Sequence, residues 1–390
     1  MSGDAFGIYV HVPYCRSRCP YCDFNSVAIA DPPWPRYTAA LTAEVKARAS
    51  AFAGLTVASV YLGGGTPSLA PADTIGRVLA AVREQFAVGA APEITLEANP
   101  GTLDPTHLAS LRQLGCNRLS LGLQSTSDRL LAVLGRAHTA AQGLESVREA
   151  RRAGFENVSV DLIFAVPGQS LADLEADLEK VLALEAEHVS IYALTYHAGT
   201  DFEARRRAGR LTPVDEDLES DMMDRIDLLL THAGLEHYEV SNYARPGRRA
   251  VHNTLYWTGA KYLGVGAGAH SFTHKEWRHG WRWEGRRDPE AYVAAWEAVS
   301  NRGLPPPKGP TTEAVETLSQ EQLARERILC GLRYVDGIDL REPAFAGMLT
   351  WIEPALAAAK RRYWITRDGS RVRPTPVGMR FGDALAALFF

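Results

Sequence analysis

Short apolar segments recur through the first 200 residues of the chain, and longer amphipathic segments separate them. Most of the apolar segments are continuous rather than strictly alternating, as in parallel strands that are covered on both faces. They predict six strands, at residues 7–12, 57–62, 93–98, 118–123, 158–164 and 188–194.

The segments between these strands have helical periodicity. Tyr37, Leu41 and Val45 are four residues apart, and so are Ile75 and Leu79. Each set therefore lies on one face of a helix. Strands that alternate with helices predict a parallel α/β sheet. Six units are too few to close an eight-fold barrel, so we expect an open, partial (β/α)6 barrel.

Two further helices are indicated by the residues at their ends. Asp104 followed by Pro105 is typical of an N-cap and a first turn, and Gly115 is typical of a C-terminal stop. Ser170 and Asp173 have the spacing of a capping box, which predicts a helix at 171–184.

The alternation of strands and helices stops near residue 200. A polar–apolar helix is predicted at 215–233, and a last strand at 236–243. Residues 303–310 are rich in Pro and Gly, as in a stiff, exposed linker. Beyond them we expect a helix at 319–332 and a hairpin at 363–373, where an Asp-Gly pair makes the turn.

A helix followed by a hairpin predicts a small α+β, winged-helix-like domain at the C-terminus. We therefore expect a barrel at 1–240, a connecting segment at 241–310 and this smaller domain at 311–390.

Composition and charge exclude several classes of protein. The formal net charge of -4 leaves no basic excess to attract nucleic acid or an anionic membrane. The first residues lack the basic start and apolar run of a secretory signal, and no apolar stretch approaches the ~18 residues that cross a bilayer. We expect a cytoplasmic protein without a transmembrane segment.

Three of the five cysteines lie within eight positions, as Cys15, Cys19 and Cys22. An odd number of cysteines, grouped in this way, argues against a disulfide framework and for a metal site in a reducing compartment. Three thiolates can bind three irons of a [4Fe–4S] cluster and leave the fourth iron open to a ligand.

A zinc site is the main alternative to a cluster. Structural zinc needs four protein ligands, so a fourth would have to come from Cys116, Cys330 or His11. A trio of free thiols without metal is a further alternative, although free cysteines seldom lie so close together.

Polar residues and glycines follow the other predicted strands. The glycines in Leu62-Gly-Gly-Gly-Thr-Pro let the backbone approach a ligand closely, although an ordinary turn would also use them. Glu97, Gln124 and Arg136 come at or after strand ends, and Asp161 lies inside an apolar strand. A buried charge needs a partner, so Asp161 either binds a ligand or pairs internally, for instance with Arg118.

The C-x3-C-x2-C loop after the first strand resembles the signature of the radical S-adenosylmethionine (SAM) superfamily. This resemblance implies a [4Fe–4S] cluster whose open iron binds SAM. The superfamily reduces the cluster to cleave SAM to a 5′-deoxyadenosyl radical, so an electron donor is implied as a partner.

Five longer segments are similar to the oxygen-independent coproporphyrinogen III dehydrogenase group. These are Tyr-Val-His-Val-Pro-Tyr-Cys, Gly-Gly-Gly-Thr-Pro, Glu-Ala-Asn-Pro, Arg-Leu-Ser-Leu-Gly-Leu-Gln and Asp-Leu-Ile-Phe-Ala-Val-Pro-Gly-Gln. By position, the resemblance implies a SAM pocket lined by Tyr9, Tyr21, Gly64, Gly65, Thr66, Glu97, Gln124, Arg136, Asp161 and Ala193.

Two departures from that group resemble its HemW branch, the haem chaperones. Phe24 stands where the dehydrogenases have a fourth cysteine, and only a short segment precedes the first strand. The branch also has a His-Asn-x-x-Tyr-Trp motif, found here at His252–Trp257. The resemblance makes His252 a candidate haem ligand, with His270 as a second candidate. The alternative is a structural His252 beside core aromatic residues.

The resemblance implies a haem chaperone that binds a [4Fe–4S] cluster, SAM and haem and passes haem to an acceptor protein. The rival function is the dehydrogenase reaction, in which two propionates of coproporphyrinogen III become vinyl groups with loss of CO2. Radical SAM chemistry on an unrelated substrate is a third alternative. The oligomeric state, a homodimer included, stays open.

Overall fold

A computed structural model describes residues 4–298 and 308–390. Its main feature is a strongly curved sheet of twelve strands, in the order β14-β13-β12-β11-β1-β4-β5-β6-β7-β8-β10-β9. Six of these strands are the parallel strands of a partial barrel: β1 (Ala5–Val12), β4 (Thr56–Gly64), β5 (Ala87–Ala98), β6 (Arg118–Gln124), β7 (Val158–Phe164) and β8 (His188–Ala193).

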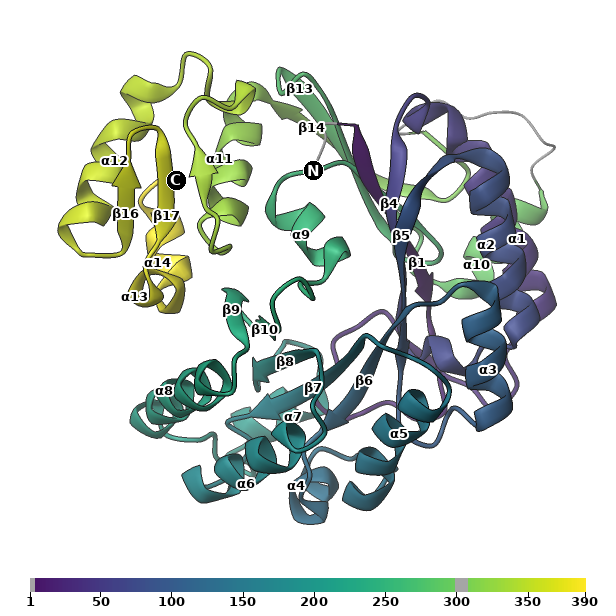
Figure 1. Cartoon of the computed structure of the whole chain (residues 1–390). Coiled ribbons are helices and arrows are strands. Elements are labelled where there is room, and N and C mark those ends of the chain that lie inside the picture. The colour runs from purple at the N-terminus through teal and green to yellow at the C-terminus, as the bar shows by residue number, and fades with distance from the viewer. Residues whose placement is uncertain (1–3, 299–307) are drawn as a thin grey trace.

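Helices cover the outer face of this curved sheet (Figure 1). The helices that alternate with its strands are α1 (Trp34–Arg48), α2 (Ala72–Gln85), α3 (Pro105–Leu114), α4 (Asp128–Val133), α5 (Ala140–Arg152) and α6 (Leu171–Leu182). Apolar side chains from both layers form the largest core of the molecule, and they include Ile8, Leu41 and Val160. The partial (β/α)6 barrel expected from the alternation of strands and helices is confirmed.

The predicted helix ends are present in α3 and α6. The Asp104 carboxylate accepts a hydrogen bond from the His107 N–H at 2.8 Å, and Gly115 ends α3 at a φ of 100°. Ser170 and Asp173 form the reciprocal capping box of α6. These local interactions satisfy backbone groups that a helix end would otherwise leave unpaired.

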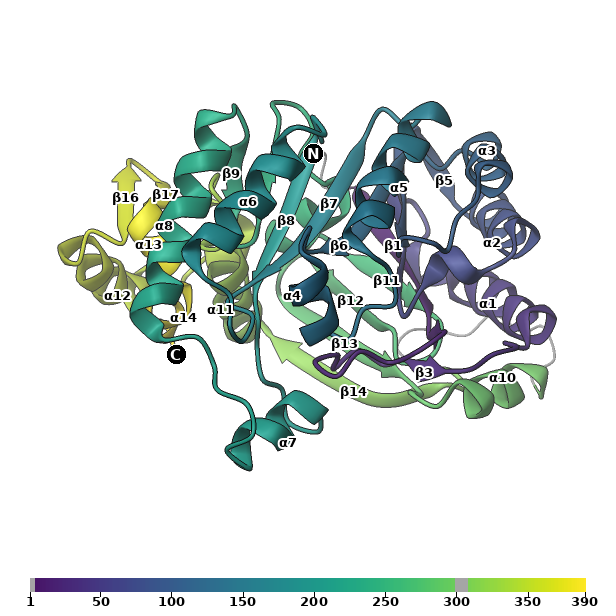
Figure 2. The same ribbon diagram turned by 90° about the horizontal axis from the view of Figure 1, so that it is seen from below.

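Two more helices follow the barrel strands, α7 (Asp201–Arg207) and α8 (Glu216–His232). Figure 2 shows α7 set apart from the helices that cover the sheet. It lies against the cysteine loop, because the Phe202 N–H donates to the Pro20 carbonyl at 3.0 Å.

The prediction of a single strand at 236–243 is wrong. The chain reverses there and forms two short antiparallel strands, β9 (Glu236–Glu239) and β10 (Asn242–Ala244). β10 also pairs antiparallel with β8, so the reversal ends the parallel part of the sheet.

The sheet also extends beyond β1 on its other side. After α9 (Val251–Trp257), strand β11 (Tyr262–Val265) pairs parallel with β1. Three antiparallel strands then follow in order: β12 (His270–Lys275), β13 (His279–Gly285) and β14 (Thr312–Ser319). The helix α10 (Pro289–Glu297) lies between β13 and β14 in the chain. Most of the predicted linker at 303–310 lies outside the described residues.

The C-terminal part has its own apolar core and the expected α+β composition. Its elements are α11 (Gln320–Gly331), β15 (Ile338–Asp339), α12 (Leu349–Arg361), β16 (Ile365–Asp368), β17 (Arg371–Pro374), α13 (Pro376–Arg380) and α14 (Gly382–Ala387). β16 and β17 form the predicted hairpin, with Gly369 at positive φ in the turn. The division at residues 240 and 310 stays a prediction.

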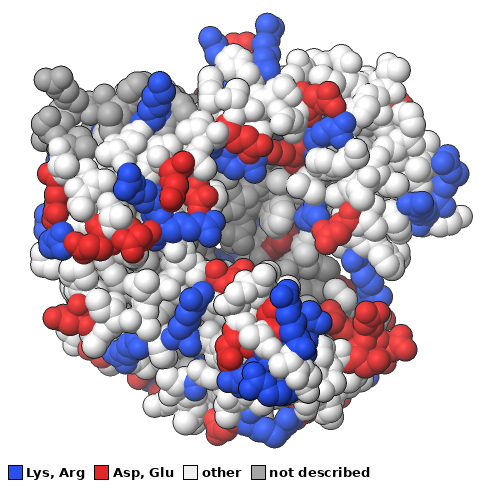
Figure 3. Space-filling model, turned by 180° about the vertical axis from the view of Figure 1, so that it is seen from behind, with Lys and Arg blue, Asp and Glu red and all other residues white. Residues whose placement is uncertain are grey.

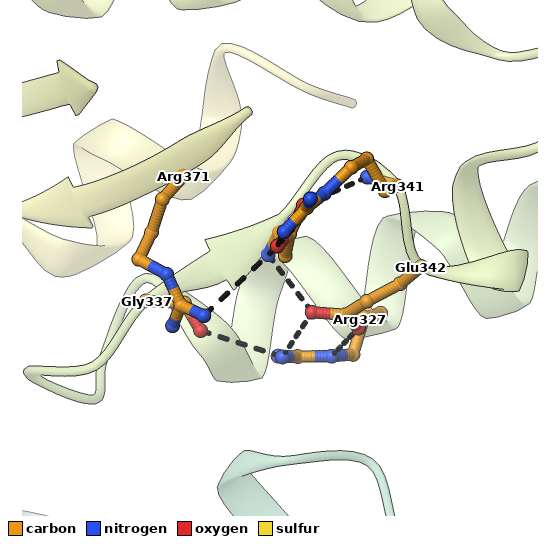
Figure 4. Close-up of polar contacts among 6 residues, drawn as sticks. Arg327, Gly337, Arg341, Glu342 and Arg371 are labelled. Carbon is orange, nitrogen blue, oxygen red and sulfur yellow. Dashed lines mark hydrogen bonds and ion pairs between the residues drawn. The ribbon is translucent and has the colours of Figure 1, made fainter. Parts of the chain in front are cut away.

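A buried arginine joins this C-terminal part to the rest of the molecule. The Arg327 guanidinium donates to both carboxylate oxygens of Glu342, at 2.6 and 2.9 Å, and to the Gly337 carbonyl at 3.3 Å (Figure 4). It also donates to the Trp257 carbonyl at the end of α9, at 3.2 Å. Arg341, which Figure 4 also labels, pairs with Asp339; the Arg341 side chain is 77% exposed and that of Asp339 is 15% exposed.

No helix among residues 4–298 and 308–390 has the length and apolar character needed to span a membrane.

We expect Arg327→Ala to lower the free energy of unfolding by about 3 kcal/mol, because it leaves the Glu342 carboxylate and two carbonyl groups without their donor. Arg341→Ala is the matched control and should change stability little, since water screens the charge of the exposed Arg341 and Arg371 also lies near Asp339. Urea unfolding followed by circular dichroism measures both variants. Equal stability of the two would show that the buried network does not hold the parts together.

Candidate functional site

The three clustered cysteines lie on a loop at the carboxyl end of β1. Cys15 is in the two-residue strand β2 (Tyr14–Cys15), which pairs with β3 (Val27–Ala28) and so closes the loop. All three thiols are partly exposed, and all three line one cavity of about 520 Å³ at the mouth of the barrel. This is the end of a parallel barrel at which ligands bind.

Neighbouring side chains donate hydrogen bonds to two of these sulfur atoms. The Thr66 hydroxyl donates to Cys15 Sγ at 3.4 Å, and the Arg136 guanidinium donates to Cys19 Sγ at 3.5 Å. Such donors stabilise negative charge on sulfur, as Fe–S ligands require. The residues present therefore fit a [4Fe–4S] cluster held by Cys15, Cys19 and Cys22.

None of the three residues considered as a fourth zinc ligand is available at the loop. Cys116 is fully buried in the core, and Cys330 lines a different cavity. Both ring nitrogens of His11 are engaged, with Tyr9 and with the Asn25 carbonyl. In the described part of the chain, no three His, Cys, Asp or Glu side chains meet as ligands of one ion. In a cluster each cysteine thiolate binds a different iron, so the three sulfur atoms do not have to converge on one metal ion.

The glycine turn after β4 is packed against the end of β1. A Cβ atom on Gly64 would lie 2.5 Å from the His11 ring, and one on Gly65 would lie 2.8 Å from the Pro13 carbonyl carbon. The N–H groups of Gly64, Gly65 and Thr66 all donate to protein acceptors. The glycines therefore provide close approach between strand ends rather than free N–H donors.

Glu97, near the end of β5, lines the same cavity as the three cysteines. Its carboxylate accepts hydrogen bonds from the Tyr61 hydroxyl at 2.7 Å and the Gly64 N–H at 3.0 Å. Burial is the main cause that raises the pKa of Glu97 to about 7, and these two donors oppose the shift. A cationic amino group in the cavity would stabilise the ionised form.

Gln124 and Arg136 occupy the same rim. Gln124 ends β6 with a φ of 67°, which is uncommon for a residue other than glycine and follows an irregularity in the pairing with β7. The Arg136 guanidinium donates to the Gly122 carbonyl at 3.0 Å and also to the Asn99 side chain. Asn99 is a cavity residue that the sequence analysis missed, although it lies in the Glu-Ala-Asn-Pro segment.

Asp161, inside β7, lines the same cavity and is bound mainly by hydroxyl groups. The Ser120 hydroxyl donates to its two oxygens at 3.0 and 3.1 Å. Burial raises the pKa of Asp161, and the hydroxyl donors and the charge of Arg118 oppose that shift. In the structure of residues 4–298 and 308–390, Asp161 and Arg118 do not form an ion pair within 4.0 Å. The direct internal pair considered for Asp161 is therefore not present.

Nine of the ten residues expected in the SAM pocket line this first cavity. They are Tyr21, Gly64, Gly65, Thr66, Glu97, Gln124, Arg136, Asp161 and Ala193. Tyr9 instead lines a second cavity of about 600 Å³, between the extended sheet and the C-terminal part. The two cavities share Asp23, Phe24, Gly64 and Glu97 as lining residues, so they adjoin each other. The face in Figure 3 is hollowed at its centre, with side chains of both charges around the hollow.

His252 lines neither of these cavities. It is buried between α9 and the barrel, where hydrogen bonds of 2.8 Å join its ring nitrogens to the Ser59 and Tyr256 hydroxyls. Its ring stacks on Tyr61, and burial lowers the pKa of His252 to about 3. In this position the imidazole is neutral, and both of its nitrogens are used.

Comparison with known proteins adds three findings. The model of the radical SAM superfamily matches residues 9–181. The Heme chaperone HemW of Mycobacterium tuberculosis is 36% identical over 344 residues, which cover 87% of this chain and 84% of that protein. That of Lactococcus lactis is 36% identical over 85% of this chain and 82% of its own length. A solved structure with the same fold is that of the Escherichia coli coproporphyrinogen III oxidase HemN, a radical SAM enzyme. Its TM-score is 0.82 at 22% identity, and the match covers 99% of this chain and 90% of that chain.

We expect Cys15→Ala, Cys19→Ala and Cys22→Ala each to abolish the charge-transfer absorbance that appears on anaerobic reconstitution with iron and sulfide. Each thiolate holds one corner of the cluster, so its loss should remove most of about four irons per chain. Cys116→Ala is the matched control and should bind iron like the unchanged protein. Full iron content in any of the three loop variants would show that its cysteine is not a ligand.

The raised pKa of Glu97 predicts a pH-dependent gain in stability for Glu97→Gln. Folding raises this pKa from 4.5 to about 7. The folded state therefore binds the proton more tightly, and ionisation costs stability as pH rises through that range. The amide oxygen can accept the Gly64 N–H and the amide NH2 can donate to the Tyr61 oxygen, but the side chain cannot ionise. The variant should therefore match the parent below about pH 4 and exceed it by up to about 3 kcal/mol at pH 8. Urea unfolding without added SAM tests this, and a pH-independent difference would contradict it.

Proposed function

Because this chain belongs to the HemW family of radical SAM proteins, we propose that it binds haem and delivers it to an acceptor protein. Membership of the superfamily implies a [4Fe–4S] cluster and SAM, and the first cavity has the residues to hold both. Such a cluster supplies the electron that cleaves SAM, so an electron donor is a further partner in this proposal.

The observation that carries the proposal is the second cavity beside the cluster loop. Aromatic side chains make up much of its wall: Tyr9, Phe24, Tyr256, Tyr262, Phe272 and Trp277. A tetrapyrrole is flat and largely apolar, and aromatic rings bury such a surface effectively. Phe24, which is 62% exposed, lines both cavities and occupies the position of the dehydrogenases' fourth cysteine.

The charges in the second cavity favour haem over coproporphyrinogen III. Its lining has three arginines, Arg282, Arg287 and Arg327, against the carboxylates of Asp23, Glu97, Glu284 and Glu326. Each arginine already pairs with a carboxylate: Arg282 with Glu326, Arg287 with Glu284 and Arg327 with Glu342. Coproporphyrinogen III has four propionates and haem has two. A lining without surplus cations accommodates the less charged tetrapyrrole more easily.

Two assays on one anaerobic preparation separate this proposal from the dehydrogenase reaction. We expect haem to bind with a saturable change in its Soret absorbance. We expect no protoporphyrinogen from coproporphyrinogen III with SAM and a reductant, measured as fluorescence after oxidation. HemN assayed in parallel shows that the turnover assay works.

Catalytic formation of protoporphyrinogen would overturn the chaperone proposal in favour of the enzyme. Absence of saturable haem binding would also overturn it. Cys19→Ala serves as a control for the cluster. It should still bind haem, because the second cavity does not include Cys19.

A further inference from the structure

The floor of the second cavity is one face of the extended sheet. In the antiparallel register, His270 of β12 is opposite Glu284 of β13, and Phe272 is opposite Arg282. Alternate residues of a strand point to the same face. All four of these residues line the cavity, so an imidazole, a carboxylate, a guanidinium and a phenyl ring share one surface.

Haem iron is bound in proteins by imidazole, thiolate, thioether or phenolate groups. Within the described residues of this cavity, the groups of these kinds belong to Tyr9, His11, Tyr256, Tyr262, His270 and Cys330. They differ in how far the protein already uses them, and this difference selects one.

His11 is 6% exposed and both of its nitrogens are hydrogen-bonded. Burial raises the pKa of the Cys330 thiol, as does the charge of Glu326, so its thiolate is disfavoured. Burial also raises the phenol pKa values of Tyr9, Tyr256 and Tyr262. None of these groups offers iron a lone pair without a cost.

His270 differs from them in exposure and in partners. Its side chain is 50% exposed, and its Nε2 lies 3.7 Å, just beyond hydrogen-bond distance, from a Glu284 oxygen that also accepts a hydrogen bond from Arg287. In the described structure its Nδ1 has no hydrogen-bond partner, so that nitrogen is free. A carboxylate that accepts the N–H of one nitrogen orients an imidazole so that the other nitrogen faces the metal, as in many metal sites.

We propose that His270 is the axial ligand of haem iron in the second cavity, and that Glu284 is its positioning residue. This rests on the proposed function, because it concerns the haem that the chaperone would bind. The aromatic side chains of this cavity would hold the tetrapyrrole, and His270 would offer its Nδ1 to the iron.

In this arrangement the His-Asn-x-x-Tyr-Trp motif shapes the cavity wall and does not bind the iron. His252 holds α9 to the barrel through Ser59 and bonds the Tyr256 hydroxyl, and Tyr256 lines the cavity. His252 is thus a positioning residue for the aromatic wall. Its replacement weakens haem binding without changing the iron ligand.

The test is a ferric haem titration of the full-length protein and of four variants, with thermal melting to show that each is folded. His270→Ala should bind haem at least tenfold more weakly. It should also change the Soret maximum and the electron paramagnetic resonance g-values, and added imidazole should restore both spectra. Glu284→Gln should retain binding but shift the g-values, because the ligand becomes less basic.

His232→Ala is the matched control, because this exposed histidine ends α8 and lines neither cavity. Its titration and spectra should equal those of the unchanged protein. A His252→Ala protein should bind haem more weakly with unchanged g-values.

Three outcomes would overturn the assignment or its premise. If the unchanged protein does not bind haem, the proposed function fails and the ligand question with it. If it binds haem and a folded His270→Ala protein keeps the same spectra, only the His270 assignment fails. If His252→Ala, rather than His270→Ala, loses the histidine-ligand spectrum and recovers it with imidazole, the ligand is His252.

Discussion

The parallel pairing of β1 with β4 is the constraint on which the rest of the site depends. In this register, His11 and Val12 are opposite Gly63 and Gly64, so the cysteine loop and the glycine turn leave the sheet side by side. The next pair, β4 with β5, brings Glu97 to the same edge, where it accepts the Gly64 N–H. A side chain at residue 64 would collide with the His11 ring and force these strand ends apart.

The second cavity depends on the same strands from their other side. β11 continues the sheet by pairing with β1, and β12 and β13 then provide the floor. α9 lies between β4 and α11, where His252 connects it to β4 and Arg327 connects it to the C-terminal part. One sheet therefore supports two adjoining cavities. A cluster-bound ligand and a tetrapyrrole would be neighbours, with Phe24 between them.

Sequence reasoning located the six barrel strands because each is a buried apolar run between amphipathic helices, a signal contained in a few neighbouring residues. β5 begins at Ala87 rather than at the expected residue 93. Its first six residues are not buried, so they lack the buried apolar pattern from which a strand was predicted. The reversal that makes β9 and β10 depends on pairing with β8, which no local pattern reveals. The capping signals of α3 and α6 were reliable, since a cap is a contact between residues three positions apart.

The site shows the same division between local and distant information. The motif residues at the carboxyl ends of the strands line the first cavity together, and their role in binding SAM stays a prediction. Tyr9 and His11 both line the second cavity. They are two residues apart on β1, so the alternation of a strand places them on the same face, and this could have been predicted from the sequence. The surroundings of His252 could not be predicted, because Ser59 and Gly7, which enclose it, are distant in the sequence.

The most direct measurement of the central claim is an anaerobic crystal structure of the protein with its cluster, SAM and haem. The account predicts a haem against the aromatic wall of the second cavity, with its iron bound by His270 and with SAM in the first cavity. A haem inside the first cavity, or one bound by His252 after α9 has moved away from the barrel, would contradict it.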